Sequence, residues 1–178
     1  MKPIFLIGYM GCGKSTIGRM SAELCDMQFV DLDAYIESRY HCTVKEIFAQ
    51  RGEAGFRDIE RAMLHEAGEF EDIIIACGGG TPCFFDNMEW MNSHGTTVLI
   101  DTPIDRLHQR LKRGKHKRPL IADKDDDELR QFIVEALDKR MPFYGRAAVT
   151  FHNDQSPQDG DKLETARRFA DEIIRPRL

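Results

Sequence analysis

A glycine-rich segment near the start of the chain carries the residue types needed to hold a string of phosphates. Residues 8–15 read GYMGCGKS and satisfy the spacing G-x-x-x-x-G-K-[ST], with Lys14 and Ser15 at its end. Glycines let successive backbone N–H groups point at phosphate oxygens, the lysine reaches the β- and γ-phosphates, and the serine hydroxyl suits Mg²⁺. The segment predicts binding of a nucleoside triphosphate, with a glycine-rich turn of structural purpose as the alternative.

Two acidic residues after the second apolar run indicate what happens to the triphosphate. Switch GTPases, ATP-driven machines and small-molecule kinases share the phosphate loop, so groups on the acceptor side have to discriminate among them. In the segment VDLDAYI, Asp31 and Asp33 lie just past a predicted strand. One acid can hold the magnesium shell through water, and the other can accept a hydrogen bond from a substrate hydroxyl and take its proton. In the alternative, Asp33 only caps the next helix and Asp31 is a solvated turn residue.

An arginine on a predicted helix is a candidate for binding an anionic substrate. Arg57, in GEAGFRDIERAM, precedes Glu60 by three residues and follows Phe56, which is expected to face the core. A guanidinium oriented by a carboxylate suits bidentate recognition of an anion. The alternative is a surface ion pair, worth about 0.2–0.5 kcal/mol.

Three consecutive glycines, Gly78, Gly79 and Gly80, follow the apolar run DIIIAC. Residues without a Cβ allow a ligand to approach the backbone closely and to meet free N–H groups. A turn needs one or two glycines, so three favour a binding role.

A basic segment lies farther along the chain. Residues 106–119 contain seven Lys or Arg and two His. A nucleic-acid surface is opposed by the lack of interleaved aromatic residues and by the adjacent DKDDDE. We expect a lid that closes over ATP phosphates and supplies an arginine to the transition state, with a merely solvated loop as the alternative.

The order of apolar runs and helical patterns predicts the elements that position these residues. Short apolar runs indicate strands at residues 3–7, 27–30, 72–77, 97–100 and 147–151. Helical patterns are expected at 14–25, through 35–36, from Thr43 to about 65 with a break near Gly52, at 88–91, 103–112, 126–139 and 162–174. Alternating strands and helices predict an α/β fold with a parallel sheet covered on both faces, whose ligands lie at the carboxyl ends of the strands.

Composition narrows the class of protein. The 178 residues, 42% hydrophobic and 31% charged, are expected to form one soluble domain, and the net charge of −5 opposes a generic nucleic-acid or membrane-surface binder. No apolar stretch approaches the roughly 20 residues of a membrane span, and the N-terminal run is too short for a signal peptide. Five cysteines without zinc-type spacing predict neither disulfides nor a metal site, which indicates a reducing cytoplasm.

The segments GYMGCGKST, DLD, GEAGFRDIE, CGGG, KRPLI and LDKRMPFY together resemble those of the shikimate kinase family, small P-loop kinases of the nucleoside-monophosphate-kinase type. They occur in the family's order from residue 4 to about 145. The resemblance implies a P-loop three-layer αβα sandwich with a central parallel sheet of about five strands. It also implies transfer of the ATP γ-phosphoryl group to the 3-hydroxyl of shikimate, in the route to chorismate and aromatic amino acids, with Mg²⁺ as cofactor.

The resemblance assigns roles to individual residues. The expected catalytic residues are Asp33, as base or orienter, Lys14, and Arg118 of the lid. Shikimate would be bound by Asp33, Arg57, Gly79, Gly80 and Arg140, with the two arginines on its carboxylate and Glu60 orienting Arg57. ATP would be bound by Gly11, Cys12, Gly13, Lys14, Ser15, Thr16, Arg113 and Arg118. Ser15, and Asp31 through water, would hold Mg²⁺.

Some points stay open at the level of the sequence. Either Arg110 or Arg113 can stack on adenine, and residues 153–157 have no firm match in the family. Arg140 is equally compatible with an exposed position at a helix end, favoured by the helix dipole.

The chain as a whole is expected to be one P-loop kinase domain over residues 1–178, with a substrate-binding helical region at about 31–65 and a lid at about 113–124. We expect a cytoplasmic monomer that binds ATP and shikimate but neither nucleic acid nor membrane. A kinase for gluconate or a nucleoside monophosphate is the nearer alternative, and an ATP-responsive binding module without catalysis is the more distant one.

Overall fold

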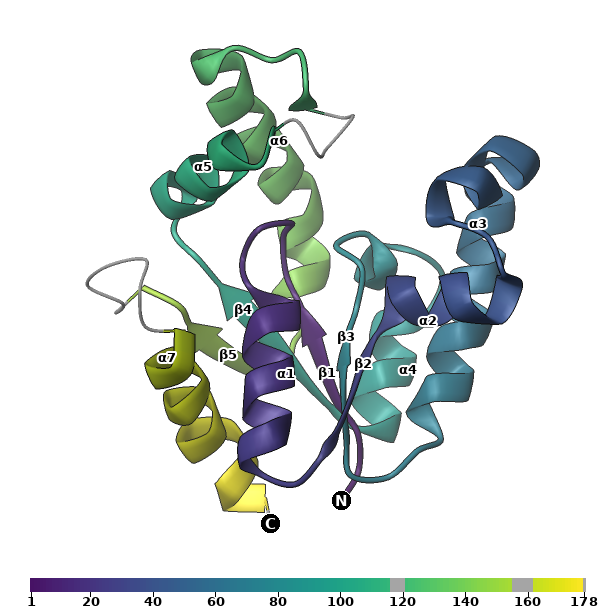
Figure 1. Cartoon of the computed structure of the whole chain (residues 1–178), viewed down its shortest axis with the longest axis vertical. Helices are drawn as coiled ribbons and strands as arrows, with labels where there is room; N and C mark the ends of the chain where they lie inside the picture. Colours follow the sequence, from purple (N-terminus) through teal and green to yellow (C-terminus); the bar gives the residue numbers. More distant parts are fainter. Residues whose placement is uncertain (116–120, 155–161, 178) are drawn as a thin grey trace.

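A five-stranded parallel sheet forms the centre of the structure (Figure 1), a computed structural model that describes residues 1–115, 121–154 and 162–177. Its order is β2-β3-β1-β4-β5, and every neighbouring pair is parallel. The strands are β1 Ile4–Ile7, β2 Gln28–Asp31, β3 Ile73–Ala76, β4 Thr96–Asp101 and β5 Val149–His152. All residues of β1 and β3 are buried, as expected for apolar strands in the middle of a sheet covered on both faces.

Helices cover both faces of this sheet (Figure 1). They are α1 Lys14–Leu24, α2 Leu32–Tyr40, α3 Val44–Gly68, α4 Asn87–His94, α5 Ile104–Arg113, α6 Asp126–Tyr144 and α7 Lys162–Phe169, followed by a π-helical turn at Ala170–Ile174 and a 3₁₀ turn at Arg175–Arg177. In Figure 1, α1 and α7 pack together in front of the sheet and α4 lies behind it. The predicted three-layer αβα sandwich is therefore confirmed. Within the described ranges, no helix is long and apolar enough to cross a membrane.

The two central strands lead to opposite faces of the sheet. β1 is followed by α1 in front, whereas its neighbour β3 is followed by the 3₁₀ turn η1 (Thr81–Cys83) and by α4 behind (Figure 1). At such a point the two connections diverge and leave room for a ligand between the carboxyl ends of the strands. The loops after β1 and β3 are the two glycine-rich segments found in the sequence.

Two pairs of helices lie on either side of these loops. α2 and the first part of α3 lie to one side in Figure 1, and α5 with α6 lie to the other. Helix α3 begins with a complete capping box between Thr43 and Glu46, as predicted. Gly52 interrupts the helical backbone with φ 67° and ψ −177°, so the predicted break is confirmed as a kink inside one long element.

One predicted helix is longer than expected. We predict an end near Lys139, but α6 continues to Tyr144 with Pro142 inside it. A proline removes one backbone donor and usually ends or kinks a helix. Here it lies only two residues before the end of the element, so the last turn still forms, and Gly145 N bonds to Met141 O at 2.8 Å.

The start of β4 depends on a glycine for close backbone contact. An ideal Cβ on Gly95 would lie 2.2 Å from the carbonyl oxygen of Pro3, next to the Thr96 N–Pro3 O hydrogen bond of 2.9 Å that aligns β4 with β1. We expect Gly95→Ala to lower the free energy of unfolding by about 2–3 kcal/mol, because the two backbones have to separate. Urea denaturation followed by circular dichroism measures this change.

Gly145→Ala is the matched control for that experiment. Gly145 has a helical φ of −64°, and its nearest contact is Met141 O at 3.1 Å. An alanine fits such a backbone, so we expect a change within about 1 kcal/mol. Equal stability of the two variants would contradict the assigned role of Gly95.

Candidate active site

The loop between β1 and α1 has the backbone shape of a phosphate cradle. Gly11 and Gly13 have φ values of 82° and 104°, a region that side chains with a Cβ rarely adopt. Gly13, the N-cap residue of α1, has no side chain that could bond to the first N–H groups of the helix. Helix N-termini of this kind attract anions through these donors and the helix dipole.

Lys14, the first residue of α1, folds back over this loop. Its Nζ atom lies 2.8 Å from the carbonyl oxygen of Gly8, 3.1 Å from that of Tyr9 and 3.6 Å from Cys12 Sγ. The ammonium group therefore lies at the cradle itself, where its charge reaches any phosphate bound by the loop.

Ser15 and Asp31 meet beside the cradle although 16 residues separate them. The Ser15 hydroxyl donates to Asp31 Oδ2 at 2.6 Å, while Asp31 Oδ1 accepts from the backbone N of Ala34 at 3.4 Å and so caps α2. The alternative in which Asp33 is the cap is wrong. A hydroxyl and a carboxylate are the hard oxygen ligands that Mg²⁺ prefers, so this pair fits that cation.

A magnesium ion here would need further ligands from its substrate. The described part of the chain holds no group of three or more His, Cys, Asp or Glu side chains able to bind a metal. Mg²⁺ commonly keeps one or two protein ligands and takes the others from water and phosphates. Ser15 and Asp31 match that pattern.

Asp33 lies in the first turn of α2 and has a perturbed acidity. The surrounding protein removes part of its hydration, and the negative charges of Asp31 and Glu60 add to this effect, raising the pKa of Asp33 to about 6. Lys14 acts in the opposite direction. The residue is nevertheless exposed at the surface, so water screens part of this effect. A carboxylate whose pKa is close to neutrality is suited to exchanging a proton with a substrate.

The glycines after β3 lie against the charged residues predicted from the sequence. An ideal Cβ on Gly78 would lie 3.4 Å from Asp33 Oδ1, one on Gly79 would lie 3.0 Å from Arg140 Nη1, and one on Gly80 would lie 2.7 Å from Arg57 Nη2. None of the three has a positive φ, so close approach, and not backbone conformation, is the reason for glycine. Gly79 also lies beside Gly8 O, which its Cβ would approach to 3.5 Å.

Arg57 is held firmly within this cluster. Its Nη1 donates to Glu60 Oε2 at 2.7 Å, and its guanidinium carbon lies 4.0 Å from the centre of the Phe84 ring. The side chain of Arg57 is 13% exposed and that of Glu60 is 1% exposed, so the alternative of a surface ion pair is wrong. A second contact, to the exposed Glu53 at 3.4 Å, is longer.

Arg140 reaches the same cluster from α6. It is half-buried, and its guanidinium lies 5.3 Å from the centre of the Tyr9 ring. One turn later, the Tyr144 hydroxyl donates to Gly79 O at 2.6 Å. The alternative of an exposed arginine at the helix end is therefore wrong. Two guanidiniums beside neighbouring glycines make an environment suited to a small anion.

A different set of contacts closes the other side of the phosphate loop. Arg110 Nη1 donates to the carbonyl oxygens of Gly11 and Cys12, both at 3.2 Å, and Asn153 Nδ2 donates to Cys12 O at 2.9 Å. Asn153 is buried, so the start of the segment without a firm family match supports the loop. Arg113 is the exposed last residue of α5, and Arg118 lies outside the described residues.

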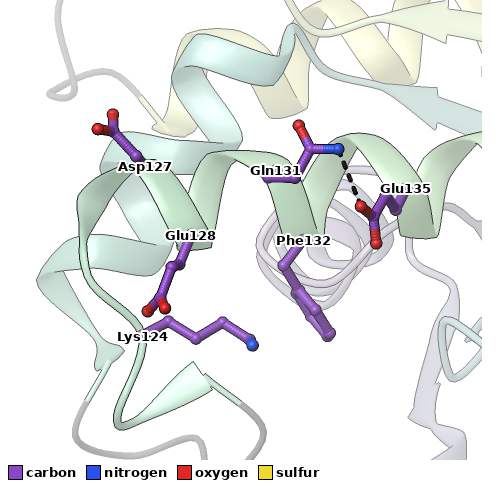
Figure 2. A pocket seen from close by; sticks show the side chains of 6 residues that line it. All are labelled: Lys124, Asp127, Glu128, Gln131, Phe132 and Glu135. Carbon is purple, nitrogen blue, oxygen red and sulfur yellow. Dashed lines mark hydrogen bonds between the residues drawn. The ribbon is translucent and has the colours of Figure 1, made fainter.

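A further cavity, of about 480 Å³, lies along α6 (Figure 2). Its lining residues are Lys124, Asp127, Glu128, Gln131, Phe132 and Glu135. None of them is a predicted site residue, and three carboxylates beside one ammonium disfavour a phosphorylated ligand. The cavity is distinct from the cluster around the two glycine loops.

Sequence reasoning did not find three residues of the cluster. Thr81 bonds to Glu60, the Phe84 ring lies under Arg57, and Tyr144 holds Gly79. Thr81 and Phe84 follow the glycines within a few residues, but only the fold shows where they point. Tyr144 is four residues after Arg140, so its position on the same helix face follows once the helix is extended beyond Lys139.

Comparisons with known proteins point to one family. A family model described as shikimate kinase matches residues 10–175. A shikimate kinase of Parabacteroides distasonis is 53% identical over 90% of this chain and 93% of its own. A crystal structure of shikimate kinase from Bacteroides thetaiotaomicron is similar with a TM-score of 0.89 and 48% identity, covering 96% of this chain and 97% of the other.

A second solved structure, shikimate kinase from Acinetobacter baumannii in complex with shikimate, has a TM-score of 0.83 and 32% identity and covers 100% of this chain and 96% of its own. Identity of about half over nearly the whole length, a similar fold and the matching family model lead to one conclusion: the chain belongs to the shikimate kinase family.

Proposed function

We propose that the protein transfers the γ-phosphoryl group of ATP to the 3-hydroxyl of shikimate. The observation that carries this proposal is the convergence of Asp33, Arg57 and Arg140 on the glycine segment beside the phosphate loop. Shikimate offers hydroxyls for a carboxylate and a carboxylate for guanidiniums. The related enzyme from Acinetobacter baumannii, solved in complex with shikimate, supports the same acceptor here.

The phosphate loop binds the donor in this proposal. Residues Gly11–Thr16 surround the phosphates with N–H groups, and Lys14 supplies the positive charge closest to the loop. Ser15 and Asp31 would hold Mg²⁺, which when bound neutralises charge on the phosphate oxygens. The pair is already joined by a 2.6 Å hydrogen bond, so both oxygens are available at one place.

Asp33 accepts a hydrogen bond from the attacking hydroxyl and takes its proton. Phosphoryl transfer passes through a loose transition state, so the protein mainly has to position the reactants and balance their charges. A carboxylate with a pKa near 6 is ionised at neutral pH and still basic enough to receive the proton as the new oxygen–phosphorus bond forms.

Arg57 and Arg140 bind the carboxylate of shikimate and orient the ring. Guanidiniums form paired hydrogen bonds with carboxylates, which fixes orientation as well as position. Their placement on two separate elements, α3 and α6, at neighbouring glycines restricts the acceptor to a small anion between them.

The organisation of the chain is part of the same proposal. We propose one P-loop kinase domain, with residues 31–65 forming the substrate-binding region and 113–124 the lid. Arg113 contacts ATP and Arg118 acts in the transition state in this proposal, although Arg118 lies outside the described residues. A monomer in the cytoplasm stays a prediction.

An acceptor panel tests the proposed function. We expect ATP-dependent ADP formation with shikimate, and formation at least about 10²-fold slower with gluconate, adenosine monophosphate or water. Gluconate is an open chain that does not hold its hydroxyls and its carboxylate at the fixed spacing of a ring, adenosine monophosphate is much larger, and water has no anionic group for the arginines. Excess EDTA is expected to stop the reaction. Faster turnover of gluconate or of adenosine monophosphate than of shikimate would mean that shikimate is not the acceptor.

Asp33→Asn tests the proton acceptor. We expect kcat to fall by about 10²–10⁴-fold while ATP affinity changes little. In the wild-type protein, kcat/KM for shikimate is expected to decrease as the pH falls through about 6, because Asp33 has to be ionised to accept the proton. Rate measurements between pH 5 and pH 8 check both statements, and full activity of Asp33→Asn would remove this role.

The thermal stability of Asp33→Asn is the control for its activity measurement. A raised pKa means that the folded protein binds this proton more tightly than the unfolded chain does, so ionised Asp33 weakens the fold above its pKa. Asp33→Asn is therefore expected not to lower the melting temperature at pH 7. A lower melting temperature would attribute lost activity to unfolding.

Arg57→Ala tests the carboxylate clamp. We expect the KM for shikimate to rise about 10²-fold and the KM for ATP to change less than about threefold, since a charge-assisted contact contributes about 2–3 kcal/mol. Arg61→Ala, one turn later on α3, removes a surface ion pair with Asp86 and serves as the control. Similar losses for both substrates would mean that Arg57 does not separate acceptor from donor.

A further inference from the structure

We propose that Thr81 is a positioning residue for the acceptor site, because its hydroxyl fixes Glu60 and Glu60 in turn fixes Arg57. The proposal rests on the proposed function, in which Arg57 binds the carboxylate of shikimate. Thr81 itself touches neither reacting group in this account. It acts through a carboxylate that it shares with the arginine.

The two oxygens of Glu60 have different partners. Oε1 accepts from Thr81 Oγ1 at 2.5 Å, and Oε2 accepts from Arg57 Nη1 at 2.7 Å. Thr81 is 0% exposed and Glu60 is 1% exposed, so water does not readily replace either partner. A buried carboxylate oxygen without a donor is strongly unfavourable, which makes the Thr81 hydroxyl a required part of the arrangement.

Thr81 is itself held in place by its backbone. Its N donates to Gly78 O at 3.1 Å, and its carbonyl oxygen accepts from Asn87 Nδ2 at 2.8 Å. Asn87 is fully buried at the start of α4, and α4 packs against the sheet. The hydroxyl is therefore presented to Glu60 by a rigid part of the core, and not by a loop that adjusts to its partner.

Gly78 has a physical reason in this arrangement. An ideal Cβ at this position would lie 3.0 Å from Thr81 Oγ1 and 3.1 Å from Glu60 Oε1, so the hydrogen bond between them passes directly against the glycine. Gly79 and Gly80 make room for Arg140 and Arg57, respectively. Gly78, in turn, makes room for the hydrogen bond between Thr81 and Glu60, the carboxylate that orients Arg57.

The other contacts of Arg57 do not replace this chain of hydrogen bonds. Glu53 is 63% exposed and lies 3.4 Å from Arg57 Nη2, and exposed pairs of this kind contribute little because water screens them. The Phe84 ring supports the plane of the guanidinium, but a ring face does not fix its rotation within that plane. The buried hydrogen bond to Glu60 is the contact that fixes this rotation.

Steady-state kinetics of Thr81→Val and Thr81→Ser test the proposal. Valine keeps the shape and removes the hydroxyl, and we expect the KM for shikimate to rise about five- to tenfold while kcat and the KM for ATP change less than twofold. Serine keeps the hydroxyl and is expected to restore a KM within about twofold of wild type. Thr81→Ala is a second variant without a hydroxyl, with the same expected rise should valine fold poorly.

Thr97→Val is the matched control. Thr97 is also 0% exposed and hydrogen-bonded, to Asn92 Oδ1, but it lies in β4 beside Phe5, toward the amino end of β1 and away from both glycine loops. We expect its KM for shikimate to stay at the wild-type value. If Thr97→Val raised the KM for shikimate as much as Thr81→Val does, the effect of Thr81→Val would be explained by a general loss of packing, and the proposal would be overturned.

A double variant separates the two proposals. If Thr81 acts through Arg57, Thr81→Val adds no further increase in KM once Arg57→Ala is present. An undiminished further increase overturns the positioning role. A KM raised by Arg57→Ala but not by Thr81→Val would support Arg57 as the carboxylate ligand and refute the role of Thr81. A KM unchanged by Arg57→Ala would refute both roles.

Discussion

The adjacency of β1 and β3 is the constraint on which the site depends. The two strands are paired through Leu6 and Ala76, and Cys77 N donates to Leu6 O at 3.0 Å just before each strand ends in glycines. Two glycine-rich loops therefore leave neighbouring strands at the same edge, one turning to the front of the sheet and the other to the back. In the proposed function, this pairing would bring a donor at the first loop and an acceptor at the second together without any long-range motion of the sheet.

This adjacency also gathers charge, and the structure has to balance it. The negative charges of Asp31 and Glu60 lie close enough to Asp33 to add to the effect of burial and raise its pKa, and the charge of Lys14 lowers it. Glu60 remains tolerable inside the protein because both of its oxygens have donors. The arrangement leaves Asp33 as the acid with incomplete compensation, and an under-compensated carboxylate is the one most ready to accept a proton.

A feature of this site can be predicted from the sequence when residues that are neighbours in the chain determine it, and not when residues far apart in the chain do. The phosphate loop, the capping box at Thr43 and the kink at Gly52 follow from neighbouring residues, and the structure confirms them. The contacts of Asp31 and Arg140 do not, because a hydrogen bond across 16 residues and a guanidinium against Gly79 arise only when the strands are ordered in space. The sequence likewise indicates that three glycines are unusual, but Gly78 is explained only by the Thr81–Glu60 contact that it accommodates.

The same difference in range explains how donor and acceptor recognition can vary independently. The cradle for phosphates is built from one continuous loop and the first turn of α1, so its geometry is set locally. The proposed acceptor side combines α2, α3, α6 and the segment after β3, and it is supported by packed residues such as Asn87, whose side chain donates to Thr81 O. We therefore expect substitutions in that packed layer to act on the acceptor while the phosphate loop keeps its shape, because the hydrogen bonds of the cradle within the described part of the chain do not involve Glu60 or Thr81.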